Sequence, residues 1–233
     1  MRYICTHTDF DASPFKDGTI ISSNELKNKY DLKIIYANNE LKPLQFNYAE
    51  GYMIYDIWKK DLDSEFIEIN HYRRKFLEET YNEEQTVLPM PLKFNILDQY
   101  KGTHNVNDLN ECFDIIRKYY PCINLNNILK GNLLFHCNMF KMRHEDFNNY
   151  CSFVFKVLDI FNEKHNFKCN EDVVSYVSYK FSNPKDIKYQ SRIQGFLMER
   201  ISTIFFLNYF NFKSLRLIPI LLLNENSLIN YNL

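Results

Sequence analysis

The chain has 233 residues, of which 45% are hydrophobic and 24% charged, and its formal net charge is −1. These values are typical of a folded globular domain, and the lack of a basic excess disfavours a nucleic-acid-binding protein. Only 5 glycines occur, and neither a GxGxxG nor a Gly-Lys-Ser/Thr loop is present, which disfavours dinucleotide-binding dehydrogenases and P-loop enzymes.

The length is suited to a single domain over residues 1–233. The first residues read as a strand rather than a signal peptide, the six cysteines form no close CxxC pair, and no apolar run is long enough to span a membrane. We therefore expect a cytoplasmic protein with reduced thiols. Peripheral contact with the inner membrane face is the alternative.

The spacing of apolar residues predicts strands and helices in turn along the chain. The expected elements are strands at 2–7 and 32–37, a helix at 46–60, a strand at 64–70, a polar loop region around Pro89 and Pro91, a helix at 107–119, a buried strand at 132–142, helices near 144–164, 170–180 and 192–209, and a strand at 215–223. Strands early and late with helices between them predict an α/β fold with a helical C-terminal half.

The sharpest local feature is the run His71-Tyr72-Arg73-Arg74, which directly follows a predicted strand. Ligands of open α/β sheets bind at the carboxyl ends of strands, and guanidinium groups bind phosphate oxygens in pairs while staying charged. The alternative is a solvated basic turn whose arginines pair with nearby glutamates, namely Glu65, Glu68, Glu78 and Glu79.

A second motif lies on the last predicted helix. Arg192, Gly195, Phe196, Glu199 and Arg200 are related by spacings of three and four residues, which places them on one helix face. Such a face can approach a ligand closely. It can equally form an internal ladder of ion pairs.

Three further patterns involve polar residues. His136 and Asn138 interrupt an apolar run, where unpaired polar groups are costly, so they mark either a site edge or satisfied core groups. Glu50 shares the early helix with Tyr55, Trp58 and Lys59, and Trp58, the only tryptophan, reads more readily as a core residue. The Asp-x-Asp at 61–63 resembles the metal-binding motif of nucleotide-sugar transferases, but it precedes the strand, and we interpret it as a solvated loop.

Taken together, these motifs resemble, in order and spacing from about residue 3 to 221, a bacterial capsule and O-antigen glycosyltransferase family. That family long stood as a domain of unknown function and includes galactofuranosyltransferases. The residues that carry the resemblance are Thr6-His7, Glu50, Tyr55, Trp58 and Lys59, His71-Tyr72-Arg73-Arg74, Asn138-Met139-Phe140, Phe147, Tyr150 and Cys151, and Arg192, Gly195, Phe196, Glu199 and Arg200. The sequence departs from the family pattern at 38–45, at Gly51-Tyr52 and at Lys75.

The resemblance implies a variant of the GT-A fold with a mixed sheet. It also implies transfer of a sugar, with galactofuranose as one candidate, from a nucleotide-diphosphate donor, for which UDP is the expected nucleotide. The implied acceptor is a capsular or O-antigen polysaccharide or a lipid-linked oligosaccharide. No metal or other cofactor is expected. In the GT-A fold a metal-binding Asp-x-Asp follows a central strand, and the resemblance puts His71-Tyr72-Arg73-Arg74 at that place, where the arginines would stabilise the departing diphosphate.

An inverting transfer needs a base, and Glu199 is the first candidate because two neighbouring arginines would keep it ionised. His136 and Asp98 are the other catalytic candidates. The residues expected to bind donor or acceptor are His7, Glu50, Tyr55, Trp58, Lys59, His71, Tyr72, Arg73, Arg74, His104, Asp108, Asn138, Met139, Arg192 and Arg200.

Two other functions stay open at this point. One is a non-catalytic subunit that keeps the fold and scaffolds a polysaccharide assembly complex. The other is a transferase of a non-sugar phosphoryl group that uses the same arginines on capsule precursors.

Overall fold

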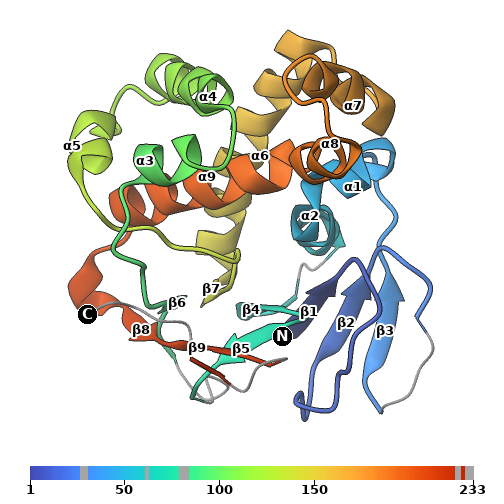
Figure 1. The fold of residues 1–233 in the computed structure, drawn as a ribbon. Helices are drawn as coiled ribbons and strands as arrows, with labels where there is room; N and C mark the ends of the chain where they lie inside the picture. The colour runs from blue at the N-terminus through green and yellow to red at the C-terminus, as the bar shows by residue number, and fades with distance from the viewer. Residues whose placement is uncertain (27–30, 61–62, 79–83, 224–226, 229–233) are drawn as a thin grey trace.

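The computed structural model describes residues 1–26, 31–60, 63–78, 84–223 and 227–228, and Figure 1 shows the helices gathered on one side of a mixed sheet. The described strands are β1 (Arg2–Thr6), β2 (Thr19–Ser22), β3 (Lys33–Tyr36), β4 (Phe66–His71), β5 (Arg74–Phe76), β6 (Val87–Pro89), β7 (Phe140–Arg143), β8 (Arg216–Ile218), β9 (Ile220–Leu222) and β10 (Ser227–Leu228). The described helices are α1 (Gln45–Tyr48), α2 (Glu50–Lys60), α3 (Ile96–Lys101), α4 (Val106–Tyr119), α5 (Leu125–Lys130), α6 (His144–His165), α7 (Asn170–Ser178), α8 (Pro184–Gln190) and α9 (Ile193–Tyr209), with 3-10 turns at Lys42–Leu44 and Phe212–Ser214.

The main path of the sheet has the strand order β10-β9-β5-β4-β1-β2-β3. Strands β1, β2, β3 and β4 are parallel, whereas β5 and β7 run antiparallel to β4. In the register of β1 and β4, Cys5 lies opposite His71, so these two neighbouring strands end at the same edge of the sheet. The topology thereby brings His7 beside the His71–Arg74 segment.

The two faces of β4 have different neighbours, because successive residues of a strand point in opposite directions. Ile67 and Ile69 are buried in the main core, under the helices. Glu68 and Asn70 point to the other face. The core side also receives the predicted apolar stripe of the long helix α6, all of which is buried: Phe147, Tyr150, Val154, Val157, Leu158 and Phe161.

The predicted strand at 132–142 is wrong over most of its length, because only Phe140–Arg143 forms a strand. The preceding backbone is irregular, with left-handed conformations at Cys137 (φ 72°) and Asn138 (φ 47°). Side chains of α9 satisfy this backbone in place of a neighbouring strand: the Phe135 N–H donates to Thr203 Oγ1 (3.0 Å). The local apolar pattern could not reveal partners more than sixty residues away.

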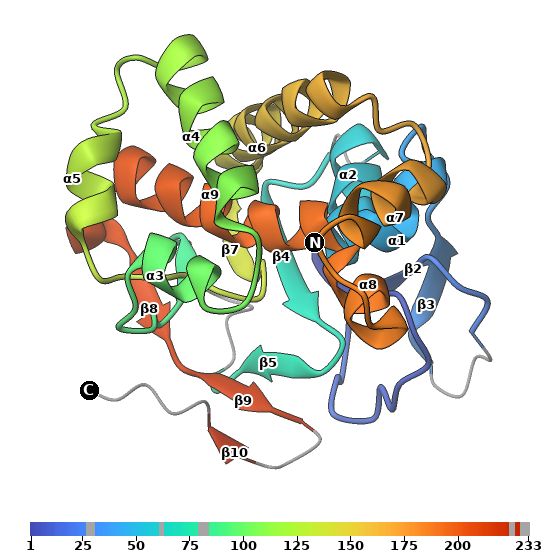
Figure 2. The same ribbon diagram turned by 45° about the horizontal axis from the view of Figure 1, so that its top comes forward.

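The predicted helix at 46–60 is interrupted at Ala49, whose φ is 49°. The interruption lies against α9, a central helix that contacts α1, α2, α4, α5 and α6 (Figure 2). Asn47 Nδ2 donates there to Ser191 O (2.7 Å). Gly195 makes this approach possible, because an added Cβ would lie 3.2 Å from both Ala49 Cβ and Tyr48 O. The break therefore starts α2 at Glu50, next to the first turn of α9.

Several short elements were not predicted: β2, β6, α3, α5 and α8. Three of these helices begin at asparagines whose side chains accept from the first backbone N–H groups, at Asn95, Asn124 and Asn183. The predicted strand at 215–223 is divided into β8 and β9 by Pro219, which has no N–H to donate. Within the described ranges, no helix combines the length and apolar character needed to cross a bilayer.

Candidate active site

The His71–Arg74 segment is a tight turn rather than an open loop. His71 and Arg74 are opposite one another in the antiparallel pair β4 and β5, and the two residues between them make the turn. The Arg73 N–H donates to His71 Nδ1 (3.1 Å), and Arg74 Nη1 lies 3.2 Å from His71 Nε2. The buried imidazole of His71 stacks on the Tyr72 ring, with centroids 4.5 Å apart. Contacts within the segment thus hold the turn, and the Arg73 side chain is exposed.

A second histidine joins this turn from the end of β1. The ring of His7 lies 5.2 Å from that of Tyr72. Burial, with Arg192 and Arg73 nearby, lowers the pKa of His7 to about 4. Burial and the adjacent Arg74 and Arg73 also lower the pKa of His71. Both imidazoles are therefore neutral near pH 7, and the positive charge here comes from guanidinium groups.

We refer to His7, His71, Arg73, Arg74 and Arg192 as the arginine–histidine cluster. Among the described residues, no carboxylate makes an ion pair with Arg73 or Arg74. The glutamates that the sequence offered as partners bind elsewhere: Glu65 pairs with Arg143, Glu68 with Arg2 and Glu78 with Arg216. Glu79 lies outside the described residues. The cluster is thus a concentration of cations at the end of two parallel strands.

Glu199 approaches the cluster from α9. Its Oε1 accepts from the Cys137 N–H (2.9 Å) and its Oε2 accepts from Arg200 Nη1 (2.8 Å), while the side chain stays 22% exposed. Arg200 itself is buried and also donates to Phe196 O and Gln99 Oε1. The ion-pair interpretation of this motif therefore holds for Arg200, which positions Glu199. The Glu199 side chain stays partly exposed.

Glu50 is a second carboxylate at the same place. It accepts from Asn138 Nδ2 (3.3 Å) and lies 4.0 Å from Arg192 Nη2. Burial and the charge of Glu199 raise its pKa. Asn138 is in turn held by Ser202, whose hydroxyl donates to Asn138 Oδ1 (3.2 Å). Ser202 is a member of this network that the sequence prediction missed, although a serine within an apolar helix is a signal for it.

His136 lies in the same loop as Asn138. Burial and the nearby Arg74 lower its pKa to about 4, against an opposing contribution from Glu199. The structure therefore brings His136 into the surroundings of Glu199. Asp98, the third catalytic candidate, is exposed on α3, and no hydrogen bond or ion pair joins its side chain to a described residue of the cluster.

Other predicted residues lie away from the cluster. Tyr55 and Trp58 pack on Phe155 of α6 with centroids 4.8 and 5.7 Å away, and the Lys59 ammonium lies 3.9 Å from the Trp58 ring centre. Met139 is buried in a small apolar group with Phe76 and neighbouring strand residues. His104 and Asp108 line a separate pocket beside α9.

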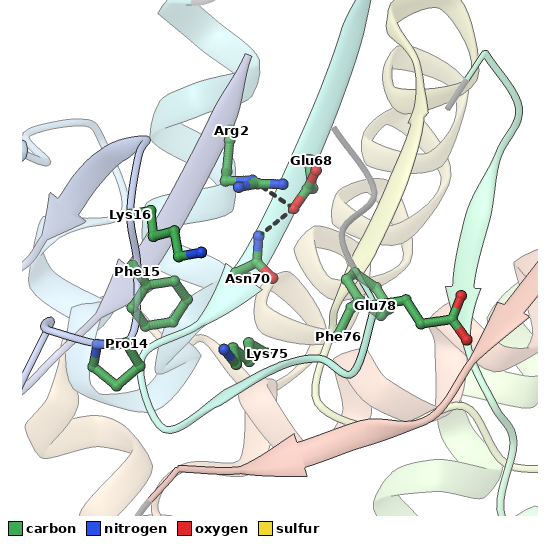
Figure 3. A pocket seen from close by; sticks show the side chains of 9 residues that line it. All are labelled: Arg2, Pro14, Phe15, Lys16, Glu68, Asn70, Lys75, Phe76 and Glu78. Carbon is green, nitrogen blue, oxygen red and sulfur yellow. Dashed lines mark hydrogen bonds and ion pairs between the residues drawn. The ribbon is translucent and has the colours of Figure 1, made fainter. Parts of the chain in front are cut away.

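A further pocket lies on the opposite face of β4 (Figure 3). It encloses about 320 Å³ of empty space, part of it open to solvent. Glu68 accepts from Arg2 Nε (2.9 Å) and Asn70 Nδ2 (2.7 Å) there, and Lys16 and Lys75 also line it. Because His71 points to the helix side, this pocket is not part of the arginine–histidine cluster.

The residues at the cluster do not suit a divalent cation. Within the described part of the chain, no three His, Cys, Asp or Glu side chains are grouped so that they could hold a metal ion. Three guanidinium groups at the end of β4 repel a cation, and both oxygens of Glu199 are engaged by donors. Of the Asp-x-Asp at 61–63, Asp61 lies outside the described residues and Asp63 is exposed before β4.

Comparison with known proteins places the chain in a family. It belongs to the family of DUF4422, described as a domain of unknown function, whose model matches residues 77–209, more than half of the chain and starting just after the His71–Arg74 turn. Among solved structures it is similar to the WbbM bifunctional glycosyltransferase, with a TM-score of 0.65 and 15% identity over 94% of this chain. The likeness covers 44% of the WbbM chain, so this chain spans less than half of that protein's length. A comparison with curated protein sequences gave no match.

These findings confirm the expected fold class, an α/β fold with a mixed sheet and a helical C-terminal half. The match to a domain of unknown function agrees with that part of the resemblance, and the His71–Arg74 motif lies outside the matched residues 77–209.

Proposed function

We propose that this protein is a glycosyltransferase that uses a nucleotide-diphosphate sugar as donor, most simply a UDP-linked one. The observation that carries the proposal is the arginine–histidine cluster, which collects Arg73, Arg74 and Arg192 at the carboxyl ends of two parallel strands. This is where ligands of open α/β sheets bind. The WbbM glycosyltransferase, which has a similar fold, supports the same class of reaction.

In the proposed reaction the guanidinium groups bind the diphosphate and stabilise the negative charge that develops as it leaves. The bond between the anomeric carbon and the β-phosphate oxygen breaks, and the acceptor oxygen bonds to that carbon. The acceptor hydroxyl proton passes to the Glu199 carboxylate. Arg200 and the Cys137 N–H hold that carboxylate in place, and the Glu199 side chain is partly exposed. The neutral His7 and His71 supply hydrogen-bonding groups without adding charge.

The base assignment is tested with Glu199→Gln, which keeps the shape and the acceptor for the Cys137 N–H but loses the basic oxygen. We expect sugar transfer to fall by about 10²–10⁴-fold, the usual contribution of general base catalysis, with UDP affinity changed less than threefold. Asp98→Asn is the matched control for the alternative base and is expected to be near wild type. Near-normal transfer in Glu199→Gln removes Glu199 from this role.

The donor is tested by mass spectrometry of reactions with UDP-, GDP- and CMP-linked sugars. A diphosphate-linked donor, galactofuranose included, is expected to be consumed. Consumption of CMP-linked sugars alone contradicts the role given to the arginines, because those donors carry one phosphate. Transfer of a phosphoryl group together with the sugar favours the phosphoryl transferase, and donor binding without transfer or hydrolysis favours the scaffold subunit.

We also propose that turnover needs no divalent cation, with the guanidinium groups of the cluster neutralising the diphosphate charge in place of a metal. EDTA-treated protein is expected to keep its activity. Loss of turnover in EDTA, restored by Mg²⁺ or Mn²⁺, contradicts this part of the proposal.

A further inference from the structure

A line of polar side chains connects the core around α6 with the guanidinium of Arg192. The Tyr150 hydroxyl lies 2.9 Å from Ser202 Oγ, and the Ser202 hydroxyl donates to Asn138 Oδ1 (3.2 Å). Asn138 Nδ2 donates to Glu50 Oε1 (3.3 Å), and Glu50 Oε2 lies 4.0 Å from Arg192 Nη2. We call Tyr150, Ser202, Asn138 and Glu50 the Asn138 relay. It joins α6, α9, the loop before β7 and the first residue of α2.

The donors and acceptors of the Asn138 relay leave one consistent arrangement. Because the Ser202 hydroxyl has a single proton, which Asn138 Oδ1 accepts, the Tyr150 hydroxyl is the donor to Ser202. An ionised carboxylate only accepts, so the Asn138 amide turns its nitrogen toward Glu50. Tyr150, Ser202, Asn138 and Glu50 are 0%, 1%, 3% and 7% exposed. Removing one buried member therefore leaves its neighbour without a partner.

The backbone of Asn138 is held independently of its side chain. Asn138 and Cys137 have left-handed conformations, with φ values of 47° and 72°. The Cys137 N–H donates to Glu199 Oε1 (2.9 Å), and the Phe135 N–H donates to Thr203 Oγ1 (3.0 Å). Two side chains of α9 thus anchor the loop through its backbone. The Asn138 amide is not needed for that purpose and is available to orient the next member of the relay.

Glu50 is the charged partner of Arg192. Arg192 is the residue before α9, its side chain is 23% exposed, and within the described ranges its guanidinium donates no hydrogen bond. At 4.0 Å the Glu50 carboxylate attracts the guanidinium without occupying its N–H groups, which stay available to an anion. Fixing a long arginine side chain costs rotamer entropy, so an arginine that is already oriented binds a ligand more tightly.

The relay also affects the charge of Glu50. Burial and the charge of Glu199 raise the pKa of Glu50, whereas Arg192 and the Asn138 amide oppose that rise. Without the amide, the neutral form of Glu50 becomes more favourable, and a neutral carboxyl attracts a guanidinium less. The Asn138 amide can thus act on Arg192 without contacting it.

We infer that Asn138 and Ser202 are positioning residues for a bound diphosphate, on which they act through Glu50 and Arg192. This inference rests on the proposed function, in which Arg192 binds the diphosphate of the donor. It places Glu50 and Asn138 behind the guanidinium that binds the ligand, and not in contact with the ligand. It adds Ser202 to the residues on which donor binding depends.

The inference is tested by calorimetry on the full chain with UDP and inorganic pyrophosphate as probes. Asn138→Gly removes the amide and suits the left-handed backbone, and Ser202→Ala removes the hydroxyl. Each is expected to weaken binding of both probes at least about fivefold, because the ligand must then order Arg192 itself. Tyr52→Phe is the matched control and should bind as wild type does. It removes a buried hydroxyl of α2 that lies outside the relay and donates to Ala37 O (3.0 Å).

A double-mutant cycle separates positioning from a merely structural role. In an Arg192→Gln background, Ser202→Ala is expected to change affinity less than about twofold, because the group through which it acts is gone. In an Arg73→Gln background it should keep its full effect. Circular dichroism and thermal unfolding accompany each variant. Asn138→Gly, placed in the same two backgrounds, keeps the test valid if Ser202→Ala fails to fold.

The inference is overturned if neither probe binds to the wild type, if both relay variants bind as wild type does, or if their losses persist undiminished in Arg192→Gln. Turnover of UDP-sugars is measured on the same proteins. Wild-type turnover together with relay variants that bind both probes normally overturns the relay alone. Pyrophosphate binding that depends on the relay, without turnover of any nucleotide sugar, leaves the relay standing and overturns the proposed function.

Discussion

The two ends of helix α2 carry residues of the same sequence motif and have different surroundings. Glu50, at the first residue, contacts Asn138 and lies 4.0 Å from Arg192 at the edge of the sheet. Trp58, two turns further on, stacks against Phe155 of α6. A rise of 1.5 Å per residue puts about 12 Å between them. A motif that is continuous in the sequence can thus contribute to a site at one end and to the core at the other.

The backbone differs between the two ends as well. The Glu50 end lies next to non-glycine residues in left-handed conformations, namely Ala49, Cys137 and Asn138. Such conformations cost about 1–3 kcal/mol each and persist where surrounding contacts hold them, often at functional sites. The Trp58 end is regular helix. We therefore expect changes at the Glu50 end to alter ligand binding, and changes at the Trp58 end to alter stability.

The largest expected effect is at the Glu50 end of α2, beside the arginine–histidine cluster. Replacing Arg73 and Arg74 together by glutamine removes two charge-assisted contacts worth about 1.5–3 kcal/mol each. UDP affinity, measured by calorimetry, should fall by about 10²–10⁴-fold. The matched control is Lys75→Gln, because Lys75 lies on the same strand but lines the pocket of Figure 3. Equal weakening by Lys75→Gln would mean that general charge, and not the cluster, binds the nucleotide.

The next largest effect is expected at the Trp58 end of α2. Phe155 is 1% exposed and supports Tyr55 and Trp58, so Phe155→Ala should lower the free energy of unfolding by about 3–5 kcal/mol. Urea unfolding measures the loss, and UDP affinity of the folded protein should stay within twofold of wild type. Phe155→Leu is the milder variant if the alanine variant does not fold. A clear loss of UDP affinity in either Phe155 variant would show that both ends of α2 contribute to one site.

A smaller effect is expected where α9 meets the start of α2. Gly195→Ala adds a Cβ 3.2 Å from Ala49 Cβ and Tyr48 O, and such overpacking costs about 1–3 kcal/mol. Because the resulting shift of α9 displaces Glu50 from Arg192, sugar transfer to the acceptor should fall along with stability. Unchanged stability and transfer would show that the helices adjust without moving Glu50.

The last expected effect is a pH dependence of stability, to which His7 and His136 near the arginine–histidine cluster contribute together with His104 elsewhere. The pKa values of His7 and His136 are lowered to about 4, mainly by burial, against about 6.5 in the unfolded chain. Between these values the unfolded chain binds more protons, so the histidine contribution to stability is complete above pH 6.5 and is lost as the pH falls toward 4. Each histidine adds at most about 1.4 kcal/mol per pH unit.

Urea unfolding at pH 7.5, 6.5 and 5.5 measures this slope. His7→Gln removes one titrating group and should flatten it, whereas Trp58→Phe at the other end should leave it unchanged. A wild-type slope that His7→Gln does not alter would indicate that His7 titrates normally in the folded protein.

Local patterns predicted much of this molecule. The alternation at 64–70 predicted β4, and the spacing of apolar residues predicted α6 and α9, because both depend on side chains only a few residues apart. The concentration of arginines at 71–74 also marked a candidate site by its side-chain chemistry alone. Short elements such as α3 and α8 were missed, since their asparagine caps are weak signals without a long apolar pattern.

What only the tertiary structure decided is which of those residues meet. Glu50, Asn138 and Arg192 come from three distant segments, and they meet because Gly195 lets α9 approach the break at Ala49 and because Glu199 and Thr203 bond to the backbone of the loop before β7. The sequence by itself determined the secondary structure and the chemistry of the side chains, which are local properties. Long-range packing decided that the arginines join His7 while Trp58 joins the core.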